Sequence, residues 1–375
     1  MLSLLIKSCQ FFLLYEGVVM RYVVITKVEK GMILGQTLYG SNYEPLYTQG
    51  TKLKSAHVKT INRLGYSGIY IHDDLSEPVQ IDPIVPESMR LSIVKAAKKY
   101  LKQAQADSVN NTLTKVSVEE QKSVVMPVIE RLLTVKDPII EHFDIKAFDD
   151  YDYYHAANVM MLSLVLGIKL GIKDNNLFEL GIASLVHDVG NAFIPSDILN
   201  KPGELTPEEF AIVKSHAEKG YDYLRNYYDL SPAACNGALQ HHENYDGTGY
   251  PGNLRKNKIS LFGRIIALTD VFDALISRRP YRHALHPYQA LDIIRQKSDR
   301  KFDPEIVYTI EKVIAPYPVA TSVELNTYEK CIVAENYADD LSRPKLYVPG
   351  KRGYYIDLKN DASFKNSTII GIINE

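Results

Sequence analysis

The spacing of hydrophobic positions divides the chain into regions of different secondary structure. Over residues 20–85, short apolar runs alternate with turns and predict strands, and residues 57–64 predict one helix. We therefore expect a small α+β accessory domain there, followed by a linker at 79–88 in which two prolines interrupt the pattern. Residues 86–147 are mostly polar and helix-favouring, which predicts a helical connector.

Apolar positions follow the helical period over residues 148–315, where long amphipathic segments alternate with short loops. Thr206 and Glu209, with a proline after the threonine, have the spacing of a capping box and predict a helix through about Arg225. Residues 316–375 return to short β-like runs with Pro and Gly turns. The expected fold class is mainly α: a helical bundle with a small N-terminal α+β domain and a short β-rich C-terminal appendage.

The charge balance excludes binding through a global positive field. Lys+Arg 43 against Asp+Glu 45 gives a net charge of −2, so an anionic ligand needs a local site. Neither nucleic acid nor a membrane surface is expected as a partner. The three cysteines are far apart without CxxC spacing, which indicates free thiols, no zinc ribbon and a reducing cytoplasm.

The first residues are not expected to cross a membrane. Residues 2–15 are apolar but shorter than the roughly 20 residues that span a bilayer, and they lack a signal-peptide cleavage site. Glu16 and Gly17 correspond to purine-rich codons at a ribosome-binding distance before Met20. We therefore expect Met20 to be the true start and residues 1–19 to come from a mis-assigned start codon.

Histidines and aspartates recur on successive predicted helices of the bundle, which favours a metal site. A lone histidine on an apolar face is more often a core residue with a satisfied hydrogen bond, and a buried aspartate is more often a cap or an ion-pair partner. Seven such positions on five helices are hard to explain separately, because facing helices of a bundle build metal sites with inward side chains. The seven positions are His155, His187, Asp188, His216, His241, His242 and Asp270.

Imidazole and carboxylate ligands without thiolates suit Fe, Mn, Zn or Co. Asp188 follows His187 directly and offers two oxygens, so it is the candidate to bridge two ions. Two ions roughly 3.5–4 Å apart activate water and stabilise the attacking and the leaving oxygen of an in-line displacement. The chemistry that fits this arrangement is phosphoester hydrolysis.

A turn-rich segment follows the histidine pair at residues 241–251. Its two glycines and its proline end the preceding helix and create a tight loop whose amides are able to face a phosphate. Alone, such a segment is equally well a plain turn. Directly after two candidate ligands, Gly249 and Tyr250 are expected to form a wall of the site.

Taken together, these motifs resemble the HD-GYP family of HD phosphohydrolases, which hydrolyse cyclic di-GMP. Residues 21–79 resemble, more weakly, a small domain often found before HD-GYP modules. The main resemblance covers about residues 148–315. Its motifs are His187-Asp188, HHExxDGxGYP at 241–251, DVFDALISRRPYR at 270–282 and FDPEIV at 302–307.

The resemblance implies an HD-type bundle with a two- or three-metal centre and with pGpG, then possibly GMP, as products. It implies that the seven His and Asp positions are metal ligands and that Asp188 is also catalytic. Arg279 and Arg282 match basic positions that contact the phosphates or guanines of the dinucleotide, although a solvated helix end explains them equally well from the residues alone. Fe or Mn is the expected metal.

Two positions depart from the family pattern. The family usually has a lysine three residues after the HD pair, where this chain has Asn191, and Lys201 is the candidate to substitute for it. Members with three metals have an acidic residue one turn before the first histidine, whereas here Tyr151 stands four positions before His155 and Asp152 three. We therefore expect two ions and leave a third open.

The leading interpretation is a cytoplasmic, metal-dependent cyclic di-GMP phosphodiesterase. The alternatives are a weakly active or inactive cyclic di-GMP receptor, because the amide of Asn191 cannot supply a charge, and a phosphodiesterase of another cyclic dinucleotide. Signalling proteins are candidate partners through the GYP loop or the N-terminal domain, and a homodimer is left open because HD-type bundles often pair.

Overall fold

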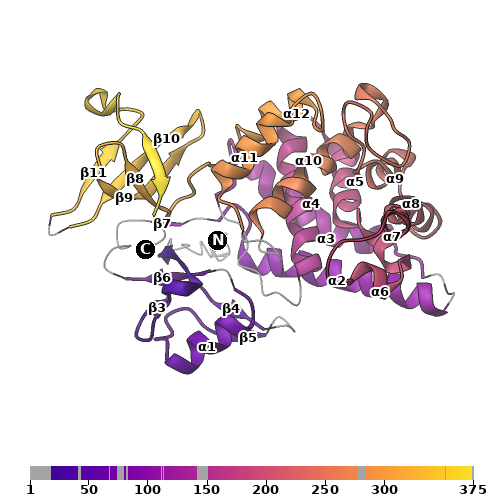
Figure 1. Cartoon of the computed structure of the whole chain (residues 1–375), viewed down its shortest axis with the longest axis horizontal. Coiled ribbons are helices and arrows are strands. Elements are labelled where there is room, and N and C mark those ends of the chain that lie inside the picture. Colours follow the sequence, from indigo (N-terminus) through magenta and orange to yellow (C-terminus); the bar gives the residue numbers. More distant parts are fainter. Residues whose placement is uncertain are drawn as a thin grey trace, which may run out of the picture.

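A computed structural model describes residues 18–40, 44–66, 68–73, 80–81, 83–110, 112, 114–141, 151–277, 284–350 and 352–373. A small N-terminal α+β part, a helical core and a C-terminal sheet follow one another along the chain (Figure 1). The expected fold class, mainly α with these two small parts, is confirmed. The proposed start at Met20 concerns a segment of which residues 1–17 lie outside the described part.

The N-terminal part is a small sheet packed against one helix. Alternate residues of the strands are buried with Ile61 of helix α1, so one face of the sheet and one face of the helix form a single apolar core. The antiparallel sheet has the order β2-β6-β3, and two further strand pairs are β1-β7 and β4-β5. The elements are β1 (Val18–Val19), β2 (Arg21–Val24), β3 (Ile33–Leu34), β4 (Leu38–Tyr39), β5 (Pro45–Tyr47), α1 (Ser55–Arg63), β6 (Gly68–His72) and β7 (Gln80–Ile81).

The stretch expected as a connector forms two helices, α2 (Glu87–Asn110) and α3 (Val118–Thr134), that belong to the helical core. Tyr100 of α2 and Val125 of α3 are fully buried in the same apolar cluster as α4. Both helices therefore pack into the same apolar cluster as the bundle, and the domain bounds expected from the sequence stay a prediction. Arg90, Asp107 and Gln121 are buried along with the apolar stripe of these helices, and this stripe attaches both helices to the core.

Helix α4 runs through the centre of the core and is buried along nearly its whole length. Ser163 of α4 contacts Thr269 of α10 at 2.9 Å between their hydroxyl oxygens, which joins the two helices that face each other at the site. The helices of this region are α4 (Tyr151–Lys169), α5 (Asp174–Leu185), α6 (Ser196–Leu199), α7 (Pro207–Lys214), α8 (His216–Tyr227), α9 (Pro232–Leu239), α10 (Leu261–Ile276), α11 (Pro287–Gln296) and α12 (Pro304–Ile310).

The capping box predicted at Thr206 is present, because its hydroxyl accepts from the Glu209 amide and Glu209 accepts from the Thr206 amide. The predicted continuous helix through Arg225 is interrupted at Ser215, and α8 begins at His216. The interruption places His216 at the first position of a new helix. This change of direction was not visible in the apolar period.

A glycine permits the closest approach of chain segments near this point. The turn η3 (Val189–Phe193) packs against the start of α8, and a Cβ at Gly190 would lie 1.9 Å from the carbonyl oxygen of His216. A side chain at residue 190 would therefore push η3 away from α8. The absence of a Cβ brings Asp188, just before η3, close to His216.

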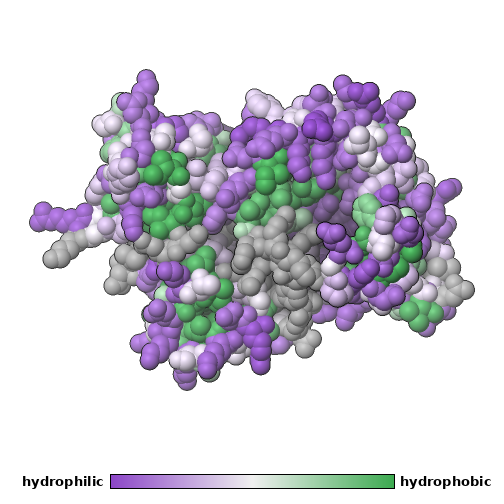
Figure 2. Space-filling model, viewed as in Figure 1, coloured by the Kyte–Doolittle hydropathy of each residue, from purple (hydrophilic) through white to green (hydrophobic). Residues whose placement is uncertain are grey.

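The C-terminal residues form a five-stranded antiparallel sheet in the order β11-β10-β9-β8-β12. Its apolar core also includes Met20 and Tyr70 of the N-terminal part. On the face in Figure 2, apolar residues form separate patches among polar ones. Within the described residues, none of the helices is both long and apolar enough to cross a membrane. The strands are β8 (Ser322–Leu325), β9 (Lys330–Tyr337), β10 (Asp340–Val348), β11 (Tyr354–Asp357) and β12 (Ile369–Ile372).

Glu141 links the core to this sheet, and its shifted pKa predicts that the free energy of unfolding depends on pH. Asn336 donates a hydrogen bond to it at 2.9 Å, but burial, with a contribution from Glu335, raises the pKa of Glu141 from 4.5 to about 7. Between these values the folded chain binds more protons than the unfolded chain, so the free energy of unfolding falls as pH rises. The loss is complete about one pH unit above the folded pKa, near pH 8.

Glu141→Gln keeps the acceptor oxygen and removes the ionisation, so this variant should lack that loss. We expect the urea midpoint of the native chain to fall relative to that of Glu141→Gln between about pH 5 and about pH 8. Glu130→Gln on the exposed face of α3 is the control and should follow the native chain. Parallel pH profiles of the native chain and Glu141→Gln would contradict the prediction.

Candidate metal centre

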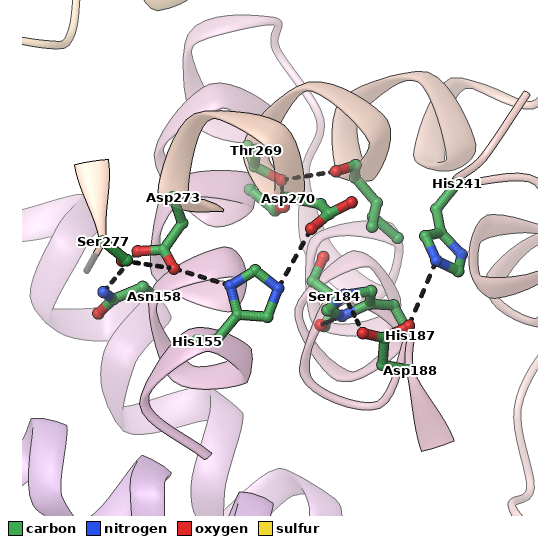
Figure 3. A network of polar contacts seen from close by, with 12 residues as sticks. His155, Asn158, Ser184, His187, Asp188, His241, Thr269, Asp270, Asp273 and Ser277 are labelled. Atoms are coloured by element: carbon green, nitrogen blue, oxygen red, sulfur yellow. Dashed lines mark hydrogen bonds and ion pairs between the residues drawn. The ribbon is translucent and has the colours of Figure 1, made fainter. Parts of the chain in front are cut away.

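The seven candidate ligands come from five segments of the core. His155 lies on α4, His216 opens α8, and Asp270 lies on α10. The pair His187-Asp188 follows α5 directly, and the pair His241-His242 follows α9, so both pairs lie where a helix ends. The structure brings these side chains to one place. Figure 3 shows five of them, His155, His187, Asp188, His241 and Asp270.

Backbone carbonyls orient three of the histidines. The Nδ1 atom of His187 lies 2.9 Å from the carbonyl oxygen of Ser184, and that of His216 lies 2.7 Å from Val213. His241 makes the same contact with Ala238, three residues earlier in each case. A carbonyl accepts only, so Nδ1 carries the proton and Nε2 has a free lone pair.

The three Nε2 atoms are the strongest sign of an ion site. Those of His187, His216 and His241 are buried and, within the described residues, have no hydrogen-bond partner. A buried polar atom without a partner is costly, and a metal ion removes this cost for an imidazole lone pair. The donor set therefore fits a bound divalent cation.

Asp188 divides its two oxygens among these histidines. Its Oδ1 lies 3.4 Å from His216 Nε2 and 3.5 Å from His241 Nε2, whereas Oδ2 lies 3.6 Å from His187 Nε2. These distances exceed hydrogen-bond lengths for direct contact and leave each oxygen facing a different imidazole set. The expected bridging role is compatible with this geometry.

Two overlapping groups of side chains are able to hold a metal ion. The first group consists of His155, His187 and Asp188, and the second consists of Asp188, His216, His241 and His242. In each group the ligand atoms lie within 4.8 Å of one another. Asp188 belongs to both groups.

Asp270 and Asp273 hold His155 from its two sides. His155 Nε2 lies 3.1 Å from Asp270 Oδ1, and His155 Nδ1 lies 2.7 Å from Asp273 Oδ2. Asn158 donates to the other oxygen of Asp273 at 2.7 Å. Asp273 is fully buried and fixes the ring of a candidate ligand without facing the cluster (Figure 3).

Asp273 was not among the predicted site residues. Its position three residues after Asp270 in an apolar run was visible, and an ionised carboxylate there requires a partner or a cation. The partner, His155, is far away in the sequence, so the spacing alone did not identify this contact.

Burial and the carboxylates have opposite effects on His155. Burial lowers the pKa of His155, but hydrogen bonds to Asp270 and Asp273 outweigh it and raise the pKa to about 9. Burial raises the pKa of Asp270, yet His155 and His187 hold it well below its usual value. The carboxylates thus stay ionised and attract positive charge, and an ion held by His155 and Asp270 would replace the imidazole proton.

The pKa values of the remaining imidazoles shift in opposite directions. Burial lowers the pKa of His187, His216 and His242, which keeps them neutral as ligands must be. Burial has the same effect on His241, but contact with Asp188 outweighs it and raises the pKa of His241. The neighbouring histidines in turn hold the pKa of Asp188 far below its usual value despite burial.

The GYP loop lines the centre through Tyr250. Its ring stacks on His242 with 4.8 Å between ring centroids and an angle of 30°. Gly249 is required by packing, because a Cβ there would lie 2.2 Å from the Asn244 amide nitrogen. Glu243 is buried and accepts hydrogen bonds from the Gly252 and Leu254 amides, which holds the loop against the helix end.

The other expected site residues lie outside the two groups. The Lys201 ammonium contacts both carboxylate oxygens of Glu209, at 2.7 and 2.9 Å, so a role at a phosphate requires breaking this ion pair. Asn191 lies in η3 after Asp188. Tyr151 stacks on the His155 ring at 5.5 Å. Arg279 and Arg282 lie outside the described residues.

Comparison with known proteins agrees with this geometry. Residues 127–306 match a family model described as HD domain. The chain is 36% identical over 206 residues to a cyclic di-GMP phosphodiesterase of Pseudomonas aeruginosa, covering 54% of this chain and 49% of that protein. It is 38% identical over 160 residues to a cyclic di-GMP phosphodiesterase of Thermotoga maritima, covering 42% and 44%.

A third relative is named for a different substrate. The chain is 36% identical over 176 residues to a 3'3'-cGAMP-specific phosphodiesterase of Vibrio cholerae, covering 46% of this chain and 38% of that protein. The chain thus spans half or less of the length of these three relatives.

Proposed function

We propose that the chain, whose residues 127–306 match the HD domain family model, is a metal-dependent phosphodiesterase that hydrolyses cyclic di-GMP to pGpG, with GMP left open as a further product. The observation that carries the proposal is the set of three buried Nε2 atoms around Asp188 that have no hydrogen-bond partner among the residues that the structure describes. Such donors fit divalent cations, and the relatives named cyclic di-GMP phosphodiesterases support the substrate.

The side chains have distinct roles in this mechanism. Bound divalent ions would activate water and stabilise the charge of the phosphate. His155, His187 and Asp270 would hold one ion, His216, His241 and His242 the other, with Asp188 contributing an oxygen to each. We infer two ions, Fe or Mn, and no assignment for a third.

Other side chains prepare the site for the phosphodiester. When an ion replaces the proton on His155 Nε2, Asp273 would keep the other proton on Nδ1 and so direct the Nε2 lone pair to the cluster. The Tyr250 ring covers His242 and forms an apolar wall that limits the access of water from that side. Gly249 and Tyr250 border the substrate in this proposal, and Arg279 and Arg282 are its proposed contacts to phosphate or guanine. Asp188 is the proposed catalytic carboxylate.

A receptor with little turnover is the second candidate. The amide of Asn191 supplies no charge, and Lys201 is neutralised by Glu209, so neither position offers a free cation for the leaving oxygen. A phosphodiesterase of another cyclic dinucleotide is the third, supported by the relative from Vibrio cholerae. Signalling partners through the GYP loop or the N-terminal domain, a homodimer and a cytoplasmic location remain proposals.

One assay distinguishes these functions. The purified chain is loaded separately with Mn and Fe(II), incubated with cyclic di-GMP or 3'3'-cGAMP, and the products are separated by chromatography. Formation of pGpG that is lost in His187→Ala but retained in His57→Ala, on helix α1, supports the proposal. Tight binding of cyclic di-GMP without product in either metal supports the receptor, and faster cleavage of 3'3'-cGAMP supports the third function.

A further inference from the structure

Lys214 places its ammonium group beside the metal centre. It is the last residue of α7, two positions before His216, and its Nζ lies 5.8 Å from the ring centroid of Tyr250. Tyr250 stacks on His242 and also meets the edge of His216, at 6.5 Å between ring centroids. The Tyr250 ring is therefore a common neighbour of the ammonium group and of two candidate ligands.

A second ring restricts the ammonium group. Lys214 Nζ lies 5.1 Å from the ring centroid of Phe210, one turn earlier on α7. Two rings attract a cation through their faces and reduce the conformations open to a flexible side chain. The group is thus partly ordered before any ligand arrives, which lowers the entropy lost when a ligand binds.

The charge of Lys214 is not neutralised by a carboxylate of the described chain. The neighbouring Lys201 is paired with Glu209, and Lys219 donates to the carbonyl oxygen of Phe193 at 2.9 Å. Among the ion pairs of the described residues, none includes Lys214. It is a half-buried cation with three donors available beside the centre.

A phosphodiester requires such a cation. Each phosphate keeps a negative charge, and the carboxylates of the centre repel it wherever bound ions do not compensate. An ammonium group on the rim binds a phosphate oxygen by a charge-assisted hydrogen bond without occupying the position of an ion.

We propose that Lys214 is a substrate-binding residue whose ammonium group, held against Tyr250 and Phe210, binds a non-bridging phosphate oxygen of the phosphodiester. This inference rests on the proposed function, because it requires a phosphodiester at the metal centre. A role limited to the end of α7, where a cation is favourable for the helix dipole, would affect stability and leave substrate binding as it is.

The test compares variants of the full chain that keep or remove the positive charge of residue 214. Lys214→Met keeps an apolar stem against the rings and removes the charge, and Lys214→Arg keeps the charge. Lys312→Met is the control, because Lys312 Nζ also lies over a ring, that of Tyr308 at 3.9 Å, at the end of the helical core. We would measure KM and kcat for cyclic di-GMP with Mn, at several salt concentrations, and the melting temperature.

We expect Lys214→Met to raise KM by about 10-fold or more, with kcat changed by less than about 3-fold, because one charge-assisted hydrogen bond is lost. The decrease of kcat/KM with salt should be shallower in Lys214→Met than in the native chain and in Lys312→Met. Lys214→Arg should restore most of the affinity and the native salt dependence.

Equal KM values and salt slopes in all four proteins overturn the proposal. An equal increase of KM in Lys214→Met and Lys214→Arg with an unchanged salt slope also overturns the proposal, because packing and not charge then accounts for the effect. Bis(4-nitrophenyl) phosphate separates this result from failure of the proposed function. If this diester is cleaved and depends on Lys214 while cyclic di-GMP is not cleaved, only the cyclic di-GMP assignment falls. Cleavage of neither diester overturns both.

Discussion

Replacement of Asp188 by asparagine is expected to lower kcat for cyclic di-GMP by about three orders of magnitude or more. The two Asp188 oxygens face different imidazole sets, at 3.4 Å from His216 and 3.6 Å from His187, so its charge serves both ion positions. An amide offers one weak oxygen ligand and an NH₂ group that repels a cation. Loss of ion binding removes several kcal/mol of charge stabilisation, and each 1.4 kcal/mol is tenfold in rate.

The measurement combines turnover with metal content. Elemental analysis of Asp188→Asn after reconstitution should show fewer ions per chain than the native protein binds. Asp222→Asn, on the exposed face of α8, is the matched control and should keep both rate and metal content. A folded Asp188→Asn with native metal content and native rate would show that Asp188 does not hold the ions.

Replacement of Asp273 by asparagine is expected to lower metal affinity by about 10-fold to 100-fold. The Asp273 carboxylate accepts from His155 on one oxygen and from Asn158 on the other. In Asp273→Asn one of these donors meets an NH₂ group, so the His155 ring loses its fixed orientation or Asn158 loses its partner. Carboxylates that hold ligand histidines typically contribute affinity of this size.

Titration of the chain with Mn, followed by calorimetry, measures this effect without relying on activity. The loss should diminish at high metal concentration, because the ligands themselves remain. Asp222→Asn is again the control. A native metal affinity in folded Asp273→Asn would show that the orientation of His155 does not depend on this carboxylate.

The sequence was sufficient to predict that the seven His and Asp side chains lie close together. Helical period places His155 on the buried stripe of its helix, and the pairs His187-Asp188 and His241-His242 follow apolar segments, so their convergence follows from bundle packing. The helix start at Thr206 was equally predictable, because a cap hydroxyl and the proline after it are local signals.

Contacts between distant segments were not predictable in the same way. The role of Asp273 depends on His155, 118 residues earlier, and the pairing of Lys201 with Glu209 depends on how α7 packs after its first turn. The break at Ser215 and the closeness of Gly190 to His216 arise from packing of backbone against backbone. Such contacts follow from tertiary structure, and one sequence contains no period or motif that reports them.

Met20 and Tyr70, near the start of the chain, are buried with the last five strands in one apolar cluster. The N-terminal α+β part and the C-terminal sheet therefore share one apolar core. A displacement of the first part must carry the final sheet with it or expose this cluster to water. Removing either end by truncation would leave an apolar face on the other, so the pair is best treated as one mechanical unit in any shortened version of the protein.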